Sequence, residues 1–162
     1  MKRTAIMTLA AAALACLPLV GGAGNKPVNA FTESAAVASH AGQVRVTITF
    51  DNRGAHPVYV PNDLATEEEL TNAFFEITTI DGEKIPYIGI MAKRAPPSAE
   101  DYRKIGPRSK HVNTIDITPS FDFKPGSHHY VLSYEARYLT DLKNLDKPSS
   151  AGMVRVEFTH AK

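Results

Sequence analysis

The chain has 162 residues, of which 43% are hydrophobic and 22% are charged, a composition typical of one globular domain. Three of its 18 Lys and Arg residues precede residue 31, which leaves 15 bases against 17 acids and a formal charge of −2 for residues 31–162. That balance excludes the basic surface that a nucleic-acid-binding protein needs. Cys16 is the only cysteine, so a form of the protein without it can have neither a disulfide nor a thiolate metal site.

The N-terminal segment, residues 1–30, is predicted to be a secretory signal peptide. A basic start precedes an apolar run from Thr4 to Val20, and small residues follow it. We expect cleavage after Ala30, although residues 21–23 offer a second cut site. An alternative takes residues 13–16 as a lipoprotein box, which would leave Cys16 lipidated and the protein tethered to a membrane. The usual Leu three places before the cysteine is missing, so we favour an exported protein, periplasmic or secreted, with a single domain over residues 31–162.

From residue 43 onward the sequence predicts strands joined by turns. Apolar residues at 44, 46, 48 and 50 alternate with polar ones, which is the pattern of a strand with one buried face. Thr66 and Glu69 form a capping box and predict a short helix. The Asp81-Gly82 pair predicts a tight hairpin turn. In chain order, the expected strands are 43–50, 56–60, 74–80, 85–91, 110–118, 129–138 and 153–158.

Seven short strands without a long helix favour an all-β fold. Turn signals recur about every ten to fifteen residues, a spacing typical of a two-sheet β-sandwich of the immunoglobulin or fibronectin kind. A small barrel is the alternative. Because each inward side chain contributes about 1.5 to 3 kcal/mol on burial, such a core needs no disulfide or metal for its stability.

The sequence contains none of the common catalytic motifs. It has no His-Glu-x-x-His, no Gly-x-Ser-x-Gly and no phosphate-binding glycine loop. Among its six histidines, His128 and His129 are adjacent on an expected strand and should point to opposite faces, so they cannot chelate one metal as a pair. The acidic run Glu67–Glu69 is typical of a solvated helix start. We therefore expect no enzymatic activity, no cofactor and no metal site.

Residues 92–104 carry the strongest indication of a function. They are too polar for a buried strand, and Pro96-Pro97 favours an extended, presented conformation. A stiff exposed loop binds a partner at low entropic cost. A crossover between the two sheets is an equally simple interpretation of this segment. The candidate partner-binding residues are Lys93, Arg94, Pro96, Pro97, Glu100, Asp101, Tyr102 and Lys104.

Several stretches of the sequence resemble a known family. They are Ile80–Gly89 (IDGEKIPYIG), Lys93–Tyr102 (KRAPPSAEDY), and the positions Asp116, Phe121, Asp122 and Gly126. In these residues the chain resembles the N-terminal β-sandwich region of bacterial peptidyl-Lys metalloendopeptidases, the deuterolysin-like aspzincin family. The similarity runs from about Val44 to Tyr138, and its specific part is the central block that ends in Glu-Asp-Tyr.

The resemblance implies binding and not catalysis. Enzymes of this family continue into a helical catalytic domain, where the two histidines of His-Glu-x-x-His and a distant aspartate hold zinc, and residues 1–162 contain no such motif. In the zymogen, the N-terminal region covers the protease domain, assists its folding and blocks its cleft. The resemblance therefore implies a propeptide-like inhibitor or folding chaperone that acts in trans on a secreted zinc metalloendopeptidase.

A protease that accepts lysine must have an acidic pocket, and an exposed basic side chain on a rigid loop could fill that pocket. Lys93 is the first candidate for this role, and Arg94 and Lys104 are the next. Two other functions stay open, an adhesion or carbohydrate-binding sandwich and a non-functional remnant of a longer secreted protease. A carbohydrate-binding surface would need an exposed aromatic row, for which the candidates are Tyr59, Tyr87, Tyr102 and Tyr130. We expect a monomer.

Overall fold

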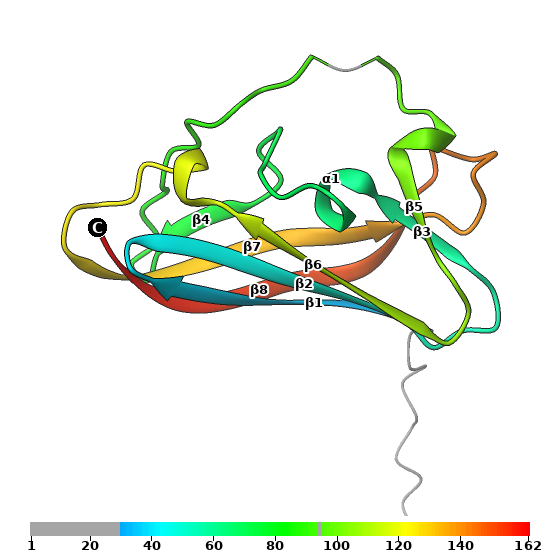
Figure 1. Cartoon of the computed structure of the whole chain (residues 1–162), viewed down its shortest axis with the longest axis horizontal. Helices are drawn as coiled ribbons and strands as arrows, with labels where there is room; N and C mark the ends of the chain where they lie inside the picture. Colours follow the sequence, from blue (N-terminus) through cyan, green and yellow to red (C-terminus); the bar gives the residue numbers. More distant parts are fainter. Residues whose placement is uncertain (1–29, 94) are drawn as a thin grey trace, which may run out of the picture.

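The computed structural model describes residues 30–93 and 95–162, so Arg94 and the predicted signal peptide up to residue 29 lie outside the described residues. Within these ranges the chain forms eight strands, one α-helix and two 3-10 helices (Figure 1). The strands are β1 (Phe31–His40), β2 (Gln43–Asn52), β3 (Val58–Pro61), β4 (Glu76–Thr79), β5 (Tyr102–Ile105), β6 (Ser109–Asp116), β7 (Ser127–Tyr138) and β8 (Ser149–Ala161). The helices are α1 (Asn62–Ala65), η1 (Ala99–Asp101) and η2 (Thr118–Ser120).

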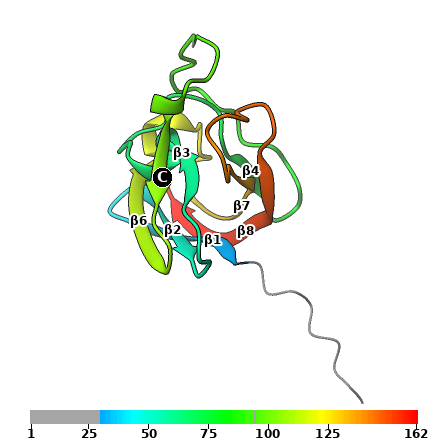
Figure 2. The same ribbon diagram turned by 90° about the vertical axis from the view of Figure 1, so that its right-hand side faces the viewer.

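Two antiparallel three-stranded sheets, β1-β2-β6 and β4-β7-β8, enclose the core, and β3 and β5 form a small third sheet. Figure 2 shows the larger sheets curving around one interior, with β1 and β8 side by side where they meet. Backbone hydrogen bonds between Tyr59 and Leu139 join the small sheet to the end of β7. The fold is therefore an all-β sandwich, as the sequence predicts.

The central strands form where the alternating pattern predicts them. In β2, the apolar residues Val44, Val46, Ile48 and Phe50 are fully buried, and the intervening residues lie on the opposite face of the strand. Each of these burials contributes about 1.5 to 3 kcal/mol. In β7, the equivalent inward residues lie on the opposite wall of the sandwich, so the two central strands supply both sides of the core.

Aromatic rings fill the interior near the end of β8. The Phe123 ring centroid lies 5.3 Å from that of Tyr130, 6.2 Å from that of Phe158 and 4.8 Å from that of His160. These are edge-to-face contacts, which add to the burial energy of each ring. The chain after η2 is thereby fixed against both β7 and β8.

Two strands were not predicted from the sequence. β1 pairs with β2 over its whole length, although its alanines and serines give only a weak alternation. A tight turn at Ala41-Gly42, where both residues have positive φ, makes this pairing local. β5 lies in the polar segment that we interpreted as a loop, and it forms because Ile105 is buried opposite Val58.

The expected strand 85–91 is wrong, although the turn before it forms as predicted. Gly82 has a φ of 91°, and its N–H donates to the Thr79 carbonyl at 2.9 Å. The return arm keeps two further bonds, from Thr79 N–H to the Glu83 carbonyl at 2.7 Å and from Ile85 N–H to the Ile77 carbonyl at 2.8 Å. Pro86 then removes a donor from the ladder, and the chain leaves β4.

The expected short helix forms, but its predicted start at Thr66 is wrong, because the helical turn lies before that residue. α1 ends at Ala65, and the Thr66 N–H closes it by donating to the Asn62 carbonyl at 2.8 Å. The residues after α1 cover the edge of β6 instead, where the Asp116 N–H donates to the Glu68 carbonyl at 2.8 Å. A strand edge that needed covering therefore overrode the capping-box signal.

Candidate functional site

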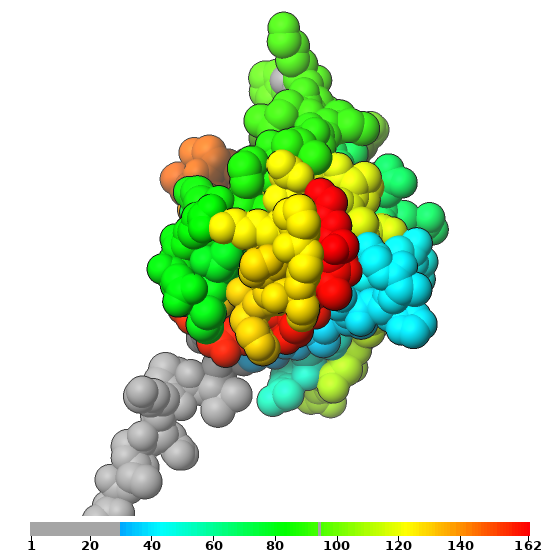
Figure 3. Space-filling view, turned by 90° about the vertical axis from the view of Figure 1, so that its left-hand side faces the viewer, coloured from blue at the N-terminus to red at the C-terminus, as the bar shows by residue number. Residues whose placement is uncertain are grey.

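Residues 86–98 project from the sandwich, and we call this segment, apart from residue 94, the arch (Figures 1 and 3). Its first part is fixed to the body by three backbone hydrogen bonds, one of which runs from the Asp122 N–H to the Pro86 carbonyl at 3.1 Å. The Ile88 N–H donates to the Ser120 carbonyl at 2.9 Å, and the Ala92 N–H donates to the Thr71 carbonyl at 3.0 Å. Figure 3 shows the arch as a green ridge that stands above the rest of the molecule.

The far end of the arch is fixed by side chains around η1. Ser98 and Asp101 form a capping box, in which the Ser98 N–H donates to the Asp101 carboxylate at 2.7 Å. The Asn62 side-chain amide donates to the Glu100 carbonyl at 2.7 Å. Tyr102 then enters β5, so the chain is ordered by ladder hydrogen bonds as soon as the arch ends.

The predicted site residues divide between the arch and its base. Lys93, Pro96 and Pro97 lie on the arch, whereas Glu100, Asp101, Tyr102 and Lys104 lie in η1 and β5; Arg94 lies outside the described residues. All the described members are exposed except Tyr102, which is half-buried. The segment also connects the β4 sheet to the β3–β5 sheet, so the crossover interpretation holds for its path.

A small hollow of about 370 Å³ lies beneath the arch, between Pro97 and Tyr102 on one side and Pro61 and Phe74 on the other. Partial burial raises the pKa of the Tyr102 hydroxyl, and the neighbouring Asp101 charge raises it further. The hydroxyl therefore stays neutral at physiological pH, where it can donate a hydrogen bond but offers no negative charge. The hollow suits an apolar side chain better than a charged group.

Sequence reasoning missed an apolar shoulder on the rising part of the arch, formed by Ile88, Ile90 and Met91. These side chains are 62%, 62% and 68% exposed. The Tyr87 hydroxyl shapes the shoulder by donating to the Ile90 carbonyl at 2.7 Å, and Gly89 leaves room for that hydroxyl, which a Cβ would approach to 2.8 Å. Pro86 and Gly89 were the available signals that this apolar run is not a strand.

A groove of about 610 Å³ runs beside the shoulder, and most of its lining is apolar. Phe74 and Phe75 form one wall, and Ile85 and Tyr87 form the other. The Tyr87 ring packs edge-on against Phe121 at 5.4 Å, which fixes the second wall to the core. Burial raises the pKa of the Tyr87 hydroxyl, so it stays neutral, and the charged groups in the lining, Lys84 and Glu76, form an ion pair with each other at 2.7 Å.

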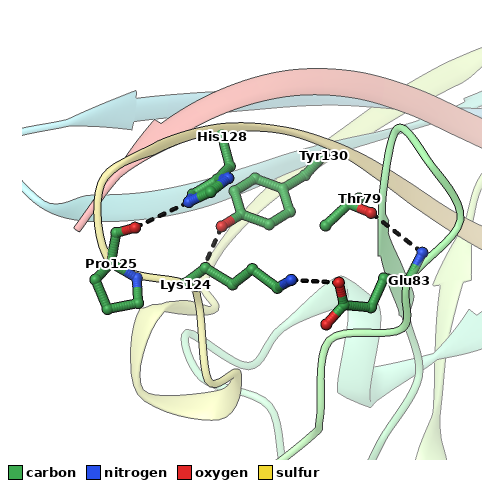
Figure 4. Close-up of polar contacts among 6 residues, drawn as sticks. All are labelled: Thr79, Glu83, Lys124, Pro125, His128 and Tyr130. Atoms are coloured by element: carbon green, nitrogen blue, oxygen red, sulfur yellow. Dashed lines mark hydrogen bonds and ion pairs between the residues drawn. The ribbon is translucent and has the colours of Figure 1, made fainter.

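A polar cluster at the start of β7 fixes the turn at Gly82 to the turn at Gly126 (Figure 4). Lys124 forms an ion pair with Glu83, and the Lys124 N–H donates to the Tyr130 hydroxyl at 3.2 Å. The His128 imidazole donates to the Pro125 carbonyl at 2.8 Å, whereas the ring of His129 contacts the Thr159 hydroxyl at 3.0 Å. Each of these groups has a structural partner, so the cluster explains local rigidity and not chemistry.

The four tyrosines considered for a carbohydrate-binding row do not form one. Tyr130 is fully buried in the core, and Tyr59, Tyr87 and Tyr102 are half-buried. Tyr87 faces the groove and Tyr102 faces the hollow beneath the arch. A row of ring faces for sugar stacking is therefore missing from the surface that residues 30–93 and 95–162 present.

Over the same described residues, no group of three or more His, Cys, Asp or Glu side chains has a metal-binding arrangement. None of the helices in that part of the chain has the length and apolar character needed to span a bilayer.

No family model matches the chain, and no curated protein matches it in sequence. Two solved structures share part of its backbone path. One is a penta-heme cytochrome c552 from Thermochromatium tepidum, with a TM-score of 0.36, 8% identity, and alignment over 80% of this chain and 40% of that one. The other is the thioester domain of the Enterococcus faecium TIE86 protein, with a TM-score of 0.22 and 12% identity over the same shares. This chain thus spans 40% of the length of each, and similarities this low support no argument about function.

Proposed function

We propose that this protein is an exported, non-catalytic protein-binding domain that acts on a secreted zinc metalloendopeptidase as a propeptide-like inhibitor or folding chaperone. The observation that carries the proposal is the arch, an exposed segment whose two ends are tied to the body by named hydrogen bonds. The sequence resemblance supplies the class of partner, and the predicted signal peptide supplies an exported location, periplasmic or secreted.

Pre-ordering of the arch favours tight binding. A loop that is already fixed in the free protein loses little conformational entropy when a partner covers it. The arch is also convex, a shape that complements the concave cleft of an enzyme (Figure 3). The exposed Lys93 ammonium can then enter an acidic pocket that is built to accept lysine.

The apolar shoulder extends the proposed contact surface. Three large apolar side chains within four consecutive residues are exposed on one loop, a concentration that is unusual for a surface without a partner. Most binding energy at protein interfaces comes from a few desolvated anchors, with charged groups supplying orientation. We therefore assign affinity to Ile88, Ile90 and Met91, and specificity to Lys93.

Inhibition of a peptidyl-Lys metalloendopeptidase by the purified protein tests this function. We expect micromolar protein to slow cleavage, and Lys93→Ala to raise the inhibition constant about tenfold or more, because the acidic pocket loses its counter-charge. Lys162→Ala is the matched control, since this exposed lysine follows β8 and its ammonium pairs with the exposed Asp122. We expect that variant to inhibit like the wild type.

Unchanged protease activity in the presence of excess protein would contradict an inhibitory role. In that case, a higher refolding yield of the denatured protease in the presence of the protein would support the chaperone role. Failure of both measurements would leave the remnant interpretation in place of this proposal. Equal inhibition by the wild type and Lys93→Ala would show that the contact that determines specificity lies outside the arch.

A further inference from the structure

β1 joins the fold through two different kinds of contact. Its ladder hydrogen bonds all go to β2, and its inward side chains pack across the sandwich and beside β8. Phe31 stacks against Tyr138 of β7 with ring centroids 4.6 Å apart, and the Ser39 hydroxyl contacts His160 of β8 at 2.9 Å. The only acidic side chain on this inward face lies between these two contacts, at Glu33.

Glu33 meets a buried hydroxyl and no cation. Its Oε1 and the hydroxyl oxygen of Tyr134 are both buried, and the only polar contact open to either of them among the described residues is with the other. No ion pair between described residues involves Glu33. Glu33 faces one titratable group of β7, which is Tyr134. The residue that pairs with Glu33 on β2 is Phe50, which is apolar.

We propose that the contact between β1 and β7 is a pH-sensitive switch, which is closed while the Glu33 carboxyl carries its proton and loosens when the carboxylate forms. A neutral carboxyl beside a neutral phenol can remain buried at modest cost. Glu33 as a whole is half-buried, but a carboxylate would keep its buried Oε1 without a compensating positive charge, which costs free energy.

The direction of the effect follows from the two protonation states. Desolvation raises the pKa of Glu33 from 4.5 to about 7. Burial and the Glu33 charge raise the pKa of Tyr134 well above its usual range, so the phenol stays neutral. Because the folded pKa exceeds the unfolded one, the stabilisation is complete below about pH 4.5 and is lost as the pH rises through about 7.

The other end of β1 responds to pH in the opposite direction. Burial, and to a smaller extent the Lys162 charge, lowers the pKa of His160, so this ring resists protonation in the folded protein. Its contribution is present at neutral pH and is lost as the pH falls. A loosening of β1 on the alkaline side therefore points to Glu33 and not to His160.

Hydrogen–deuterium exchange tests the switch in protein purified after expression with its own N-terminal segment. We expect the protection of residues 31–40, corrected for intrinsic exchange, to fall about tenfold or more between roughly pH 5.5 and pH 8.5. Peptides from the β7–β8 ladder should keep their protection, because their hydrogen bonds do not involve β1.

Two variants isolate the carboxyl. Glu33→Gln keeps the shape of the protonated side chain and should make the protection of residues 31–40 independent of pH. Ser34→Glu places a carboxyl on the exposed face of the same strand and should behave like the wild type. Protection that is constant with pH in the wild type, or that falls equally in Glu33→Gln, would overturn the proposal.

Discussion

Asn52 is a buried polar residue whose side chain joins the turn after β2 to the end of β5. It is 1% exposed, and its amide nitrogen lies 2.9 Å from the His56 carbonyl, 3.1 Å from that of Ile105 and 2.9 Å from that of Gly106. Its oxygen accepts the Gly54 N–H at 3.0 Å. This one side chain therefore holds the end of β2 to the strand that supports the arch.

Replacing that amide with a carboxylate should destabilise the whole domain. Asn52→Asp removes the donors and turns a negative charge toward three carbonyl oxygens, so we expect a loss of about 3 kcal/mol or more in the free energy of unfolding. Urea denaturation at neutral pH measures the loss, which should shrink in acid as the new carboxyl becomes neutral. Asn144→Asp, at an exposed site, should change the stability by less than about 1 kcal/mol. Equal losses in the two variants would contradict this account.

At the scale of elements, the Asp81-Gly82 turn shows a purely conformational requirement. Gly82 has a φ of 91°, yet a Cβ at this position would meet no atom within 4 Å. The cost of any other residue at this turn is therefore backbone strain and not a collision.

Gly82→Ala should lower the free energy of unfolding by about 1 kcal/mol through that strain. Gly106→Ala is the matched control, because this loop glycine has no positive φ and its added Cβ would make only ordinary contact, at 3.4 Å from the Ser109 hydroxyl. Thermal unfolding of the two variants measures the difference. A Gly106→Ala loss as large as that of Gly82→Ala would show that conformational freedom at the turn does not matter.

At the scale of the whole molecule, the first described strand begins directly after the predicted cleavage site. β1 starts at Phe31, and the Arg53 N–H donates to the Ala30 carbonyl at 2.7 Å. Cleavage after Ala30 would leave β1 complete but would remove the Ala30 carbonyl, whereas the alternative cut at residues 21–23 would keep it.

The intact mass of the exported protein decides between these forms. We expect a mass equal to residues 31–162 without modification, and we expect Cys16→Ser to leave export and the final mass unchanged. An N-terminal peptide that begins with a lipidated Cys16 would contradict this prediction and support the lipoprotein alternative.

The sequence predicted those parts of the fold in which a single pattern dominates. β2 and β7 are buried on one face along most of their length, so their alternation is plain. β1 and β5 were missed because their burial depends on strands far away in the chain: Phe31 packs on Tyr138, and Ile105 lies opposite Val58. Local patterns do not report such tertiary partners.

The candidate site was predictable in outline only. Pro96-Pro97 indicated a presented segment, and the arch is exposed there. The division between the arch and its base was not predictable. It depends on the η1 capping box and on the pairing of Lys104 in β5 with Tyr59 in β3. Glu33 gave no signal in the sequence, since only the approach of Tyr134 from another sheet makes its carboxyl unusual.

The position of β1 beside β8 has a consequence for export. β1 and β8 are the first and the last of the described strands, so in an exported protein, as we propose, the sandwich could close only after residues 149–161 had crossed the membrane. Contacts between distant parts of a chain form late in folding, because the intervening loop must first be ordered. In the export that the predicted signal peptide implies, the nascent protein would therefore remain open until its last strand had crossed.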